Sequence, residues 1–138
     1  MILIALSGGS PAERRKLAEL LVAESKGSIV SHAQEDTRGM LDARRVAMVD
    51  QVLGGWSRRI GLVLTHCLVE GEAERVRAKG GKVWHLYSTP SQYVPMRRGD
   101  AVVSLDDGVP AHVMTPLEAY SELVLAHRAA ALAGLRKL

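Results

Sequence analysis

The sequence contains no phenylalanine and few aromatic residues of any kind. Its 138 residues include 2 tryptophans and 3 tyrosines, so aromatics make up only 4% of the chain. Proteins that bind single-stranded DNA or RNA usually stack the bases on exposed aromatic rings. The composition therefore gives little support to a function of that class.

Long apolar runs and paired cysteines are missing as well. No stretch approaches the roughly 18 apolar residues of a membrane span, and the apolar run at residues 2–6 is too short for a secretory signal and has no basic segment before it. We therefore expect a cytoplasmic protein with no membrane partner. Cys67, the single cysteine, cannot form an internal disulfide, and its apolar neighbours predict a small buried residue.

Residues with the spacing of metal ligands are missing too. The five histidines are scattered along the chain, at His32, His66, His85, His112 and His127. None is paired with a cysteine or carboxylate in the pattern that zinc sites use. No metal site is predicted.

The charge is mildly basic. The formal net charge is +3, and the arginines include four doublets, Arg14-Arg15, Arg44-Arg45, Arg58-Arg59 and Arg97-Arg98. Doublets make a nucleic-acid-binding face only if the fold brings them together. We expect them to be solvated surface, which makes nucleic acid a less favoured partner.

The first stretch of the chain has the pattern of a phosphate-binding turn. Residues 2–6 predict a buried strand, a glycine-rich turn follows, and residues 12–25 predict a helix that Pro11 helps to start. Ser10 is the expected N-cap, with Glu13 at the capping-box position. Backbone N–H groups at such a helix N-terminus can bind phosphate, or the turn can be purely structural.

The remaining pattern alternates strands with helices. Further strands are expected at residues 28–32, 60–65, 82–87 and 100–104, and further helices at residues 36–53, 71–79 and 116–138. The polar, proline-bearing segment at residues 89–99 is predicted to be a loop over a site. This pattern favours one α/β domain over residues 1–138, a three-layer sandwich around a five-stranded, mostly parallel sheet.

Several segments resemble the deoxynucleoside monophosphate kinase branch of the P-loop kinases, known from phages and bacteria. They are Ile4-Ala5-Leu6-Ser7-Gly8 with Leu17-Ala18-Glu19-Leu20-Leu21, the stretch from Val63 to Val83 with its Gly80-Gly81-Lys82-Val83, and, more weakly, Asp100-Ala101-Val102-Val103 with Asp106-Asp107-Gly108. The resemblance implies the strand order 2-3-1-4-5 and a nucleotide as the possible ligand.

The chain departs from that family at the positions that carry the chemistry. Counted from Gly8, the second glycine of the phosphate loop becomes Glu13, the lysine becomes Arg14 and the hydroxyl residue becomes Arg15. His66 stands where the family has an aspartate, and Leu68 where it has an arginine. Because a magnesium nucleotide needs a lysine and a hydroxyl or carboxylate, we expect no phosphoryl transfer and assign no catalytic residue.

The candidate ligand-binding residues are those of the turn, with one histidine and one arginine pair that could close over it. They are Ser7, Gly8, Gly9, Ser10, Glu13, Arg14, Arg15, His66, Arg97 and Arg98. His66 follows a predicted central strand, at the sheet edge where such folds bind ligands. It can contact a ligand there, or it can be a satisfied histidine of the core.

Three functions follow from these patterns. The first is a degenerate, inactive kinase-like protein that binds a nucleotide or another phosphorylated ligand at the Gly8–Arg15 turn. The second is a phage or mobile-element protein that uses the scaffold to bind another protein. The third is an active deoxynucleotide kinase in which Arg14 replaces the lysine.

Overall fold

The chain folds into an α/β structure with a five-stranded sheet. The computed structural model describes residues 2–34, 42–56, 60–106 and 108–136. The elements, in chain order, are β1 (Leu3–Ser7), α1 (Pro11–Glu24), β2 (Ile29–His32), α2 (Asp42–Gly55), β3 (Gly61–Leu64), α3 (Glu70–Ala78), β4 (Lys82–Leu86), β5 (Ala101–Val103) and α4 (Pro116–Arg136). All strand pairs are parallel, in the order β2-β3-β1-β4-β5. The predicted fold class and strand order are confirmed.

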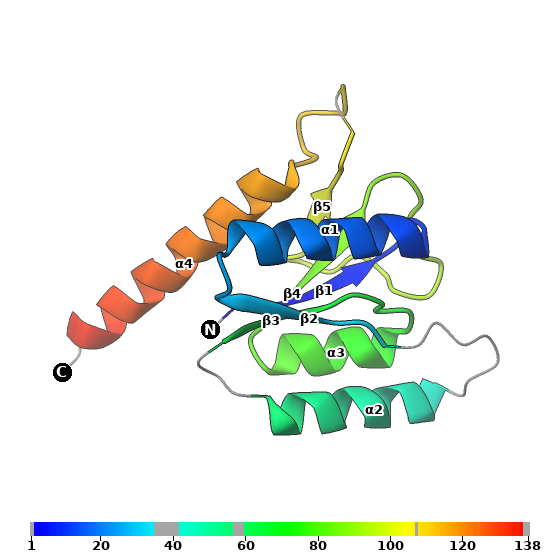
Figure 1. The fold of residues 1–138 in the computed structure, drawn as a ribbon, viewed down its shortest axis with the longest axis horizontal. Coiled ribbons are helices and arrows are strands. Elements are labelled where there is room, and N and C mark those ends of the chain that lie inside the picture. Colours follow the sequence, from blue (N-terminus) through cyan, green and yellow to red (C-terminus); the bar gives the residue numbers. More distant parts are fainter. Residues whose placement is uncertain (1, 35–41, 57–59, 107, 137–138) are drawn as a thin grey trace.

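Helices cover both faces of the sheet, as the continuous apolar character of the strands requires. Figure 1 shows α1 and α4 on one face and α2 and α3 on the other. The side chains of β1 alternate between these two layers: Ile4 and Leu6 pack with α1 and α4, whereas Leu3 and Ala5 pack with α2 and α3. β1 is therefore buried on both sides, at the centre of the molecule.

Most element boundaries lie within a few residues of the predicted ones. The second helix begins, in the described residues, at Asp42 and continues to Gly55; the part predicted at residues 36–41 lies outside the described residues. The last strand, Ala101–Val103, is shorter than the predicted residues 100–104, and Asp100 just before it places its carboxylate in a side-chain cluster.

The C-terminal helix packs on the sheet through its first half alone. Leu123 is its last buried residue in the described part of the chain, and the portion beyond it projects past the sheet in Figure 1. Within the described ranges, no helix has the length and apolar character needed to cross a membrane.

Candidate functional site

The turn between β1 and α1 lies at the carboxyl edge of the sheet and is shaped by its own sequence. Gly8 and Gly9 have φ angles of 76° and 62°, in the left-handed region that favours glycine. The predicted capping box is present: the Ser10 hydroxyl accepts from the Glu13 N–H, and the Glu13 carboxylate accepts from the Ser10 N–H, both at 3.1 Å. These features direct the chain from β1 into α1.

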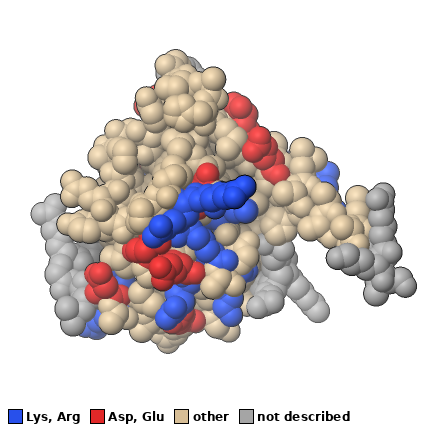
Figure 2. Space-filling model, turned by 180° about the vertical axis from the view of Figure 1, so that it is seen from behind, with Lys and Arg blue, Asp and Glu red and all other residues tan. Residues whose placement is uncertain are grey.

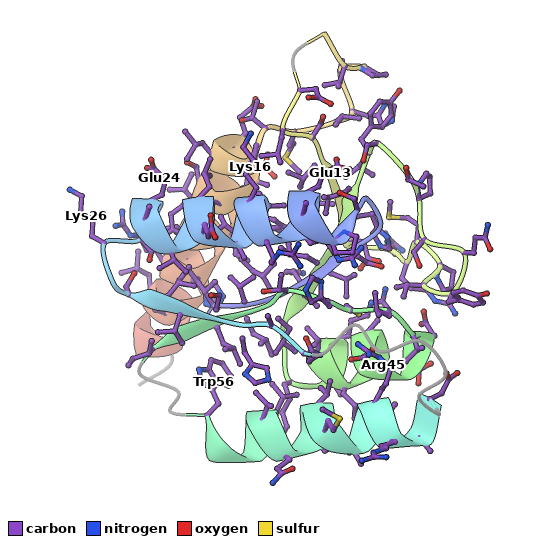
Figure 3. The ribbon with its side chains drawn as sticks, turned by 45° about the vertical axis from the view of Figure 1, so that its right-hand side comes forward. Glu13, Lys16, Glu24, Lys26, Arg45 and Trp56 are labelled. Carbon is purple, nitrogen blue, oxygen red and sulfur yellow. The ribbon has the colours of Figure 1, made fainter. Side chains whose placement is uncertain are left out.

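Two backbone N–H groups of the turn already have partners. The Gly9 N–H donates to the Thr89 carbonyl at 2.7 Å, and the Ser10 N–H donates to Glu13. The other oxygen of Glu13 accepts from the Ser88 hydroxyl at 2.7 Å. The hydrogen bonds from Ser88 and from the Ser10 backbone lower the pKa of Glu13, so its side chain is a carboxylate at neutral pH. An anion of the chain itself therefore lies at the N-terminus of α1, at the labelled position in Figure 3.

Arg14 points beneath the turn. Its side chain is buried, and one of its nitrogens, Nη1, donates to the carbonyls of Gly8 at 2.8 Å and Gly9 at 3.1 Å. Its Nε donates to Nδ1 of His66 at 3.0 Å, so Nδ1 carries a lone pair and not a proton. The guanidinium thus binds carbonyl oxygens of the turn, whereas its neighbour Arg15 is exposed.

Ser7 and His66 complete this part of the predicted site. Both are buried, Ser7 as the last residue of β1 and His66 just beyond β3. The Ser7 hydroxyl has no hydrogen-bond partner among the described residues. The structure therefore brings together the turn, Arg14 and His66, as the sequence suggested.

Arg97 and Arg98 lie in the loop between β4 and β5. Arg97 Nε is 3.5 Å from Glu70 Oε1, and the Arg97 backbone N–H donates to Asp100 at 3.0 Å. Arg98 is exposed. Within the described residues, the contacts of Arg97 attach it to α3 and to the base of β5, not to the turn.

A buried ionic network, which the sequence did not reveal, lies between α2, α3 and the sheet. Arg45 rises from α2 toward α3 (Figure 3), and its Nε is 2.9 Å from Oε1 of Glu72. Glu72 also accepts from Gln34 Nε2 at 2.8 Å, and Arg45 Nη2 donates to the His66 carbonyl at 3.0 Å. The network fixes the segment that carries His66. The Gln34 Oε1 atom has no partner among the described residues.

A second cluster, also unforeseen, joins α3 to β4 and β5. Asp100 Oδ2 lies 2.8 Å from His85 Nε2 and 2.7 Å from Arg77 Nη2, and Arg77 also pairs with Glu70 at 3.1 Å. A cavity of about 270 Å³ lies beside His85, lined by residues of the 88–99 loop such as Val94 and by His112. Residues of the predicted loop, 89–99, thus line a cavity at the β4–β5 end of the sheet edge.

On the face shown in Figure 2, acidic and basic side chains lie next to one another. Exposed ion pairs such as Arg75–Asp50, at 3.0 Å, limit any positive field. Of the arginine doublets, Arg14 and Arg45 turn inward, and Arg58-Arg59 lies outside the described residues. Nucleic acid accordingly stays a less favoured prediction.

Cys67 is buried, as predicted, and burial raises the pKa of its thiol well above the usual range. It is therefore a poor nucleophile at neutral pH. The part of the chain that the structure describes contains no group of histidine, cysteine and carboxylate side chains that could hold a metal ion.

Replacing Gly8 with alanine should destabilise the protein by about 2 kcal/mol, because the left-handed backbone disfavours a side chain there. A Cβ atom at Gly8 would also lie 2.7 Å from the Thr89 carbonyl oxygen. Chemical unfolding checks this. Gly54→Ala, at an open helical position, is the matched control, and equal stability of the two variants would contradict the expectation.

Acid should weaken the Asp100 cluster. Burial acts to raise the pKa of Asp100, but the hydrogen bonds from Arg77, His85 and the Arg97 N–H outweigh it, and the pKa is lowered. A carboxyl with a lowered folded-state pKa contributes stability that is complete above about pH 5 and is lost as pH falls through that pKa. We expect the free energy of unfolding of Asp100→Asn to fall less steeply below about pH 5 than that of the natural chain. An unchanged slope in acid unfolding would refute this role.

Comparison with known proteins found no family model, no curated protein and no solved structure that matches the chain.

Proposed function

We propose that the chain is a catalytically inactive protein of P-loop-kinase-like architecture, which binds a nucleotide or another phosphorylated ligand at the Gly8–Arg15 turn in competition with Glu13. The observation that carries the proposal is the Glu13 carboxylate, which accepts from the Ser10 N–H and from Ser88. Helix N-termini attract anions through their N–H groups and their dipole. The Glu13 carboxylate is the anion at the N-terminus of α1 until a phosphate displaces it.

The side chains of the turn do not favour phosphoryl transfer. Arg14 binds carbonyl oxygens beneath the turn, and Arg15 takes the place of the hydroxyl that would bind magnesium. Magnesium would bring no benefit to a phosphate held only by N–H groups and the exposed Arg15. We therefore expect binding that does not depend on magnesium and no transfer of phosphate.

Displacement of Glu13 would also change the loop after β4. The carboxylate holds Ser88 at 2.7 Å, and the adjacent Thr89 carbonyl holds the Gly9 N–H. A bound phosphate would release the first of these links. Binding of a phosphate at the turn would thus change the contacts of the loop that lines the cavity beside His85.

Isothermal titration with inorganic phosphate, dTMP and ADP, each with and without magnesium, tests the proposal. We expect weak binding to the natural chain and about tenfold tighter binding to Glu13→Ala, because a charge-assisted hydrogen bond no longer competes. Glu19→Ala, an exposed change on the same helix, should leave the affinity unchanged.

Two outcomes would end the proposal. If neither the natural chain nor Glu13→Ala binds any of these anions, the turn is purely structural. If phosphate passes from ATP to a deoxynucleotide in a reaction that Arg14→Ala abolishes, the chain is an active kinase with arginine in place of lysine.

A second candidate function is protein binding through α4. Among the described side chains of this helix, three leucines are exposed, Leu117 by 46%, Leu125 by 62% and Leu132 by 58%. An exposed apolar face on a projecting helix is typical of an interaction surface. Light scattering across a concentration series tests for self-association. A complex that Leu125→Lys with Leu132→Lys abolishes would support this function, whereas a monomer at every concentration would remove self-association.

A further inference from the structure

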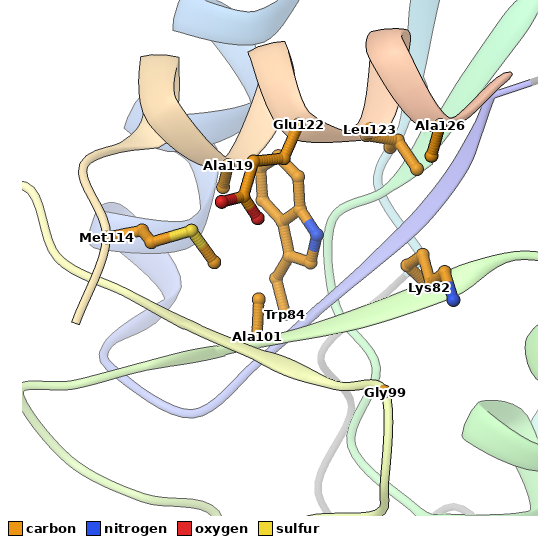
Figure 4. Close-up of a pocket in the computed structure, with 9 residues that line it drawn as sticks. All are labelled: Lys82, Trp84, Gly99, Ala101, Met114, Ala119, Glu122, Leu123 and Ala126. Carbon is orange, nitrogen blue, oxygen red and sulfur yellow. The ribbon is translucent and has the colours of Figure 1, made fainter. Parts of the chain in front are cut away.

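A separate cavity lies between α4 and the β4–β5 side of the sheet (Figure 4). Its volume is about 220 Å³, and Lys82, Trp84, Met114, Ala119, Glu122 and Leu123 are among the residues that line it. Trp84 and His85 are neighbours on a strand, so their side chains point to opposite faces of the sheet. This cavity is therefore distinct from the one beside His85 and from the Gly8–Arg15 turn.

Trp84 brings an unused hydrogen-bond donor into this cavity. The residue is only 2% exposed, and its indole N–H has no hydrogen-bond partner among the residues that the structure describes. By contrast, the indole N–H of Trp56 donates to the Ile60 carbonyl at 2.6 Å. Figure 4 shows the Trp84 nitrogen turned toward the end of the cavity where Leu123 and Lys82 lie. The Trp84 N–H opens onto the cavity, so an acceptor that enters the cavity can receive its hydrogen bond.

The same end of the cavity carries positive charge. Lys82 lines it from β4, and Gly99, which has no side chain, lies close to the Lys82 ammonium: a Cβ atom at Gly99 would be 3.8 Å from Nζ. The charge of Lys82 also reaches His127 on α4, whose pKa is lowered by burial and then by nearby positive charges. An acceptor that carries negative charge is thus favoured over a neutral one.

The rest of the cavity sets the size and the polarity of a ligand. Met114, Ala119 and Leu123 supply apolar walls. A cavity of about 150 Å³ can hold benzene, so this larger one has room for an aromatic ring or a short alkyl chain with one polar group. Glu122, on the α4 side, would repel a second carboxylate.

We infer that this cavity binds a small organic monocarboxylate, whose carboxylate accepts from the Trp84 indole N–H and faces the Lys82 ammonium while its apolar body packs against α4. The positive charge of Lys82 selects against amines, and the negative charge of Glu122 selects against dicarboxylates. The site does not depend on the turn, so it can be tested in the Glu13→Ala protein as well as in the natural chain.

Benzoate, benzamide and benzylamine are suitable probes because they share a ring and differ in charge. Isothermal titration should show binding of benzoate, about tenfold weaker binding of benzamide and no binding of benzylamine. In ¹⁵N-labelled protein, the indole N–H resonance of Trp84 should shift on addition of benzoate while that of Trp56 stays in place. Trp56→Phe assigns the two resonances.

Two substitutions locate the site. Lys82→Gln, at an exposed position, should weaken benzoate binding about fivefold, and Trp84→Phe should weaken it about tenfold by removing the donor. Lys16→Gln, an exposed change of the same type on α1, should have no effect. Near-ultraviolet circular dichroism shows whether each variant is folded.

The inference is overturned if benzoate causes no saturable change up to about 10 mM, a range that includes weak specific binding. It is also overturned if benzamide binds as well as benzoate, or if Lys82→Gln binds benzoate with the natural affinity. A variant that binds benzoate with the natural affinity is folded, so that last result could not be attributed to a folding defect.

Discussion

Glu72→Gln should destabilise the protein by about 3–5 kcal/mol, the range for removing one partner of a buried ion pair. Glu72 is 1% exposed. Its carboxylate accepts from Arg45, from Gln34 and from the backbone N–H groups of Leu68 and Val69. When Glu72 has no charge, Arg45 loses the ionic partner that lies 2.9 Å away inside the protein. Urea unfolding followed by circular dichroism measures the loss.

Glu74→Gln is the matched control, because Glu74 is exposed on the same helix and should change stability by no more than about 0.5 kcal/mol. The double variant Glu72→Gln with Arg45→Met tests whether the charge of Arg45 causes the loss, because it removes that charge and keeps an amide oxygen that can accept from Gln34 and the backbone. It should be more stable than Glu72→Gln alone. Similar stability of Glu72→Gln and Glu74→Gln would show that the network contributes little.

Arg14→Ala should cost about 2–4 kcal/mol, because hydrogen bonds to a charged group are strong and their loss leaves acceptors buried. The two turn carbonyls and Nδ1 of His66 would each lose a donor. Arg15→Ala changes the exposed neighbouring arginine and should be nearly neutral. Thermal and chemical unfolding of the two variants gives a direct comparison.

Arg14→Lys separates the structural role of Arg14 from a catalytic one. The substitution restores the residue type of a phosphate loop, but one ammonium cannot reproduce the planar fork of donors in a guanidinium. We expect partial loss of stability and no gain of phosphoryl transfer from ATP. Transfer by Arg14→Lys, or equal stability of the Arg14→Ala and Arg15→Ala proteins, would contradict the assigned role.

Local sequence signals were sufficient for much of the fold. The apolar run that became β1 is buried on both faces, and glycine doublets mark the ends of α2 and α3. The capping box could be predicted because Ser10 and Glu13 interact within one helical turn. The strand order came from the resemblance to kinases, since periodicity alone does not say which parallel strands pair.

The direction of side chains at the sheet edge could not be predicted in the same way. Whether Arg14 faces solvent or the interior depends on His66, which is 52 positions away in the sequence. Glu72 looks like a surface residue in a charged helix, and its burial depends on Arg45 and Gln34 arriving from other elements. Such long-range pairs have no local pattern, so the sequence did not reveal either ionic network.

The central position of β1 has a consequence for the order of folding during synthesis. Leu3 is in register with Leu62, and Ile4 with Lys82, so the first strand leaves the ribosome long before either of its neighbours. Pairing between distant segments is slow, because a long loop must close before contacts are gained. Until β3 and β4 are made, the nascent chain exposes an apolar strand with two open edges, which is the kind of segment that chaperones protect from aggregation.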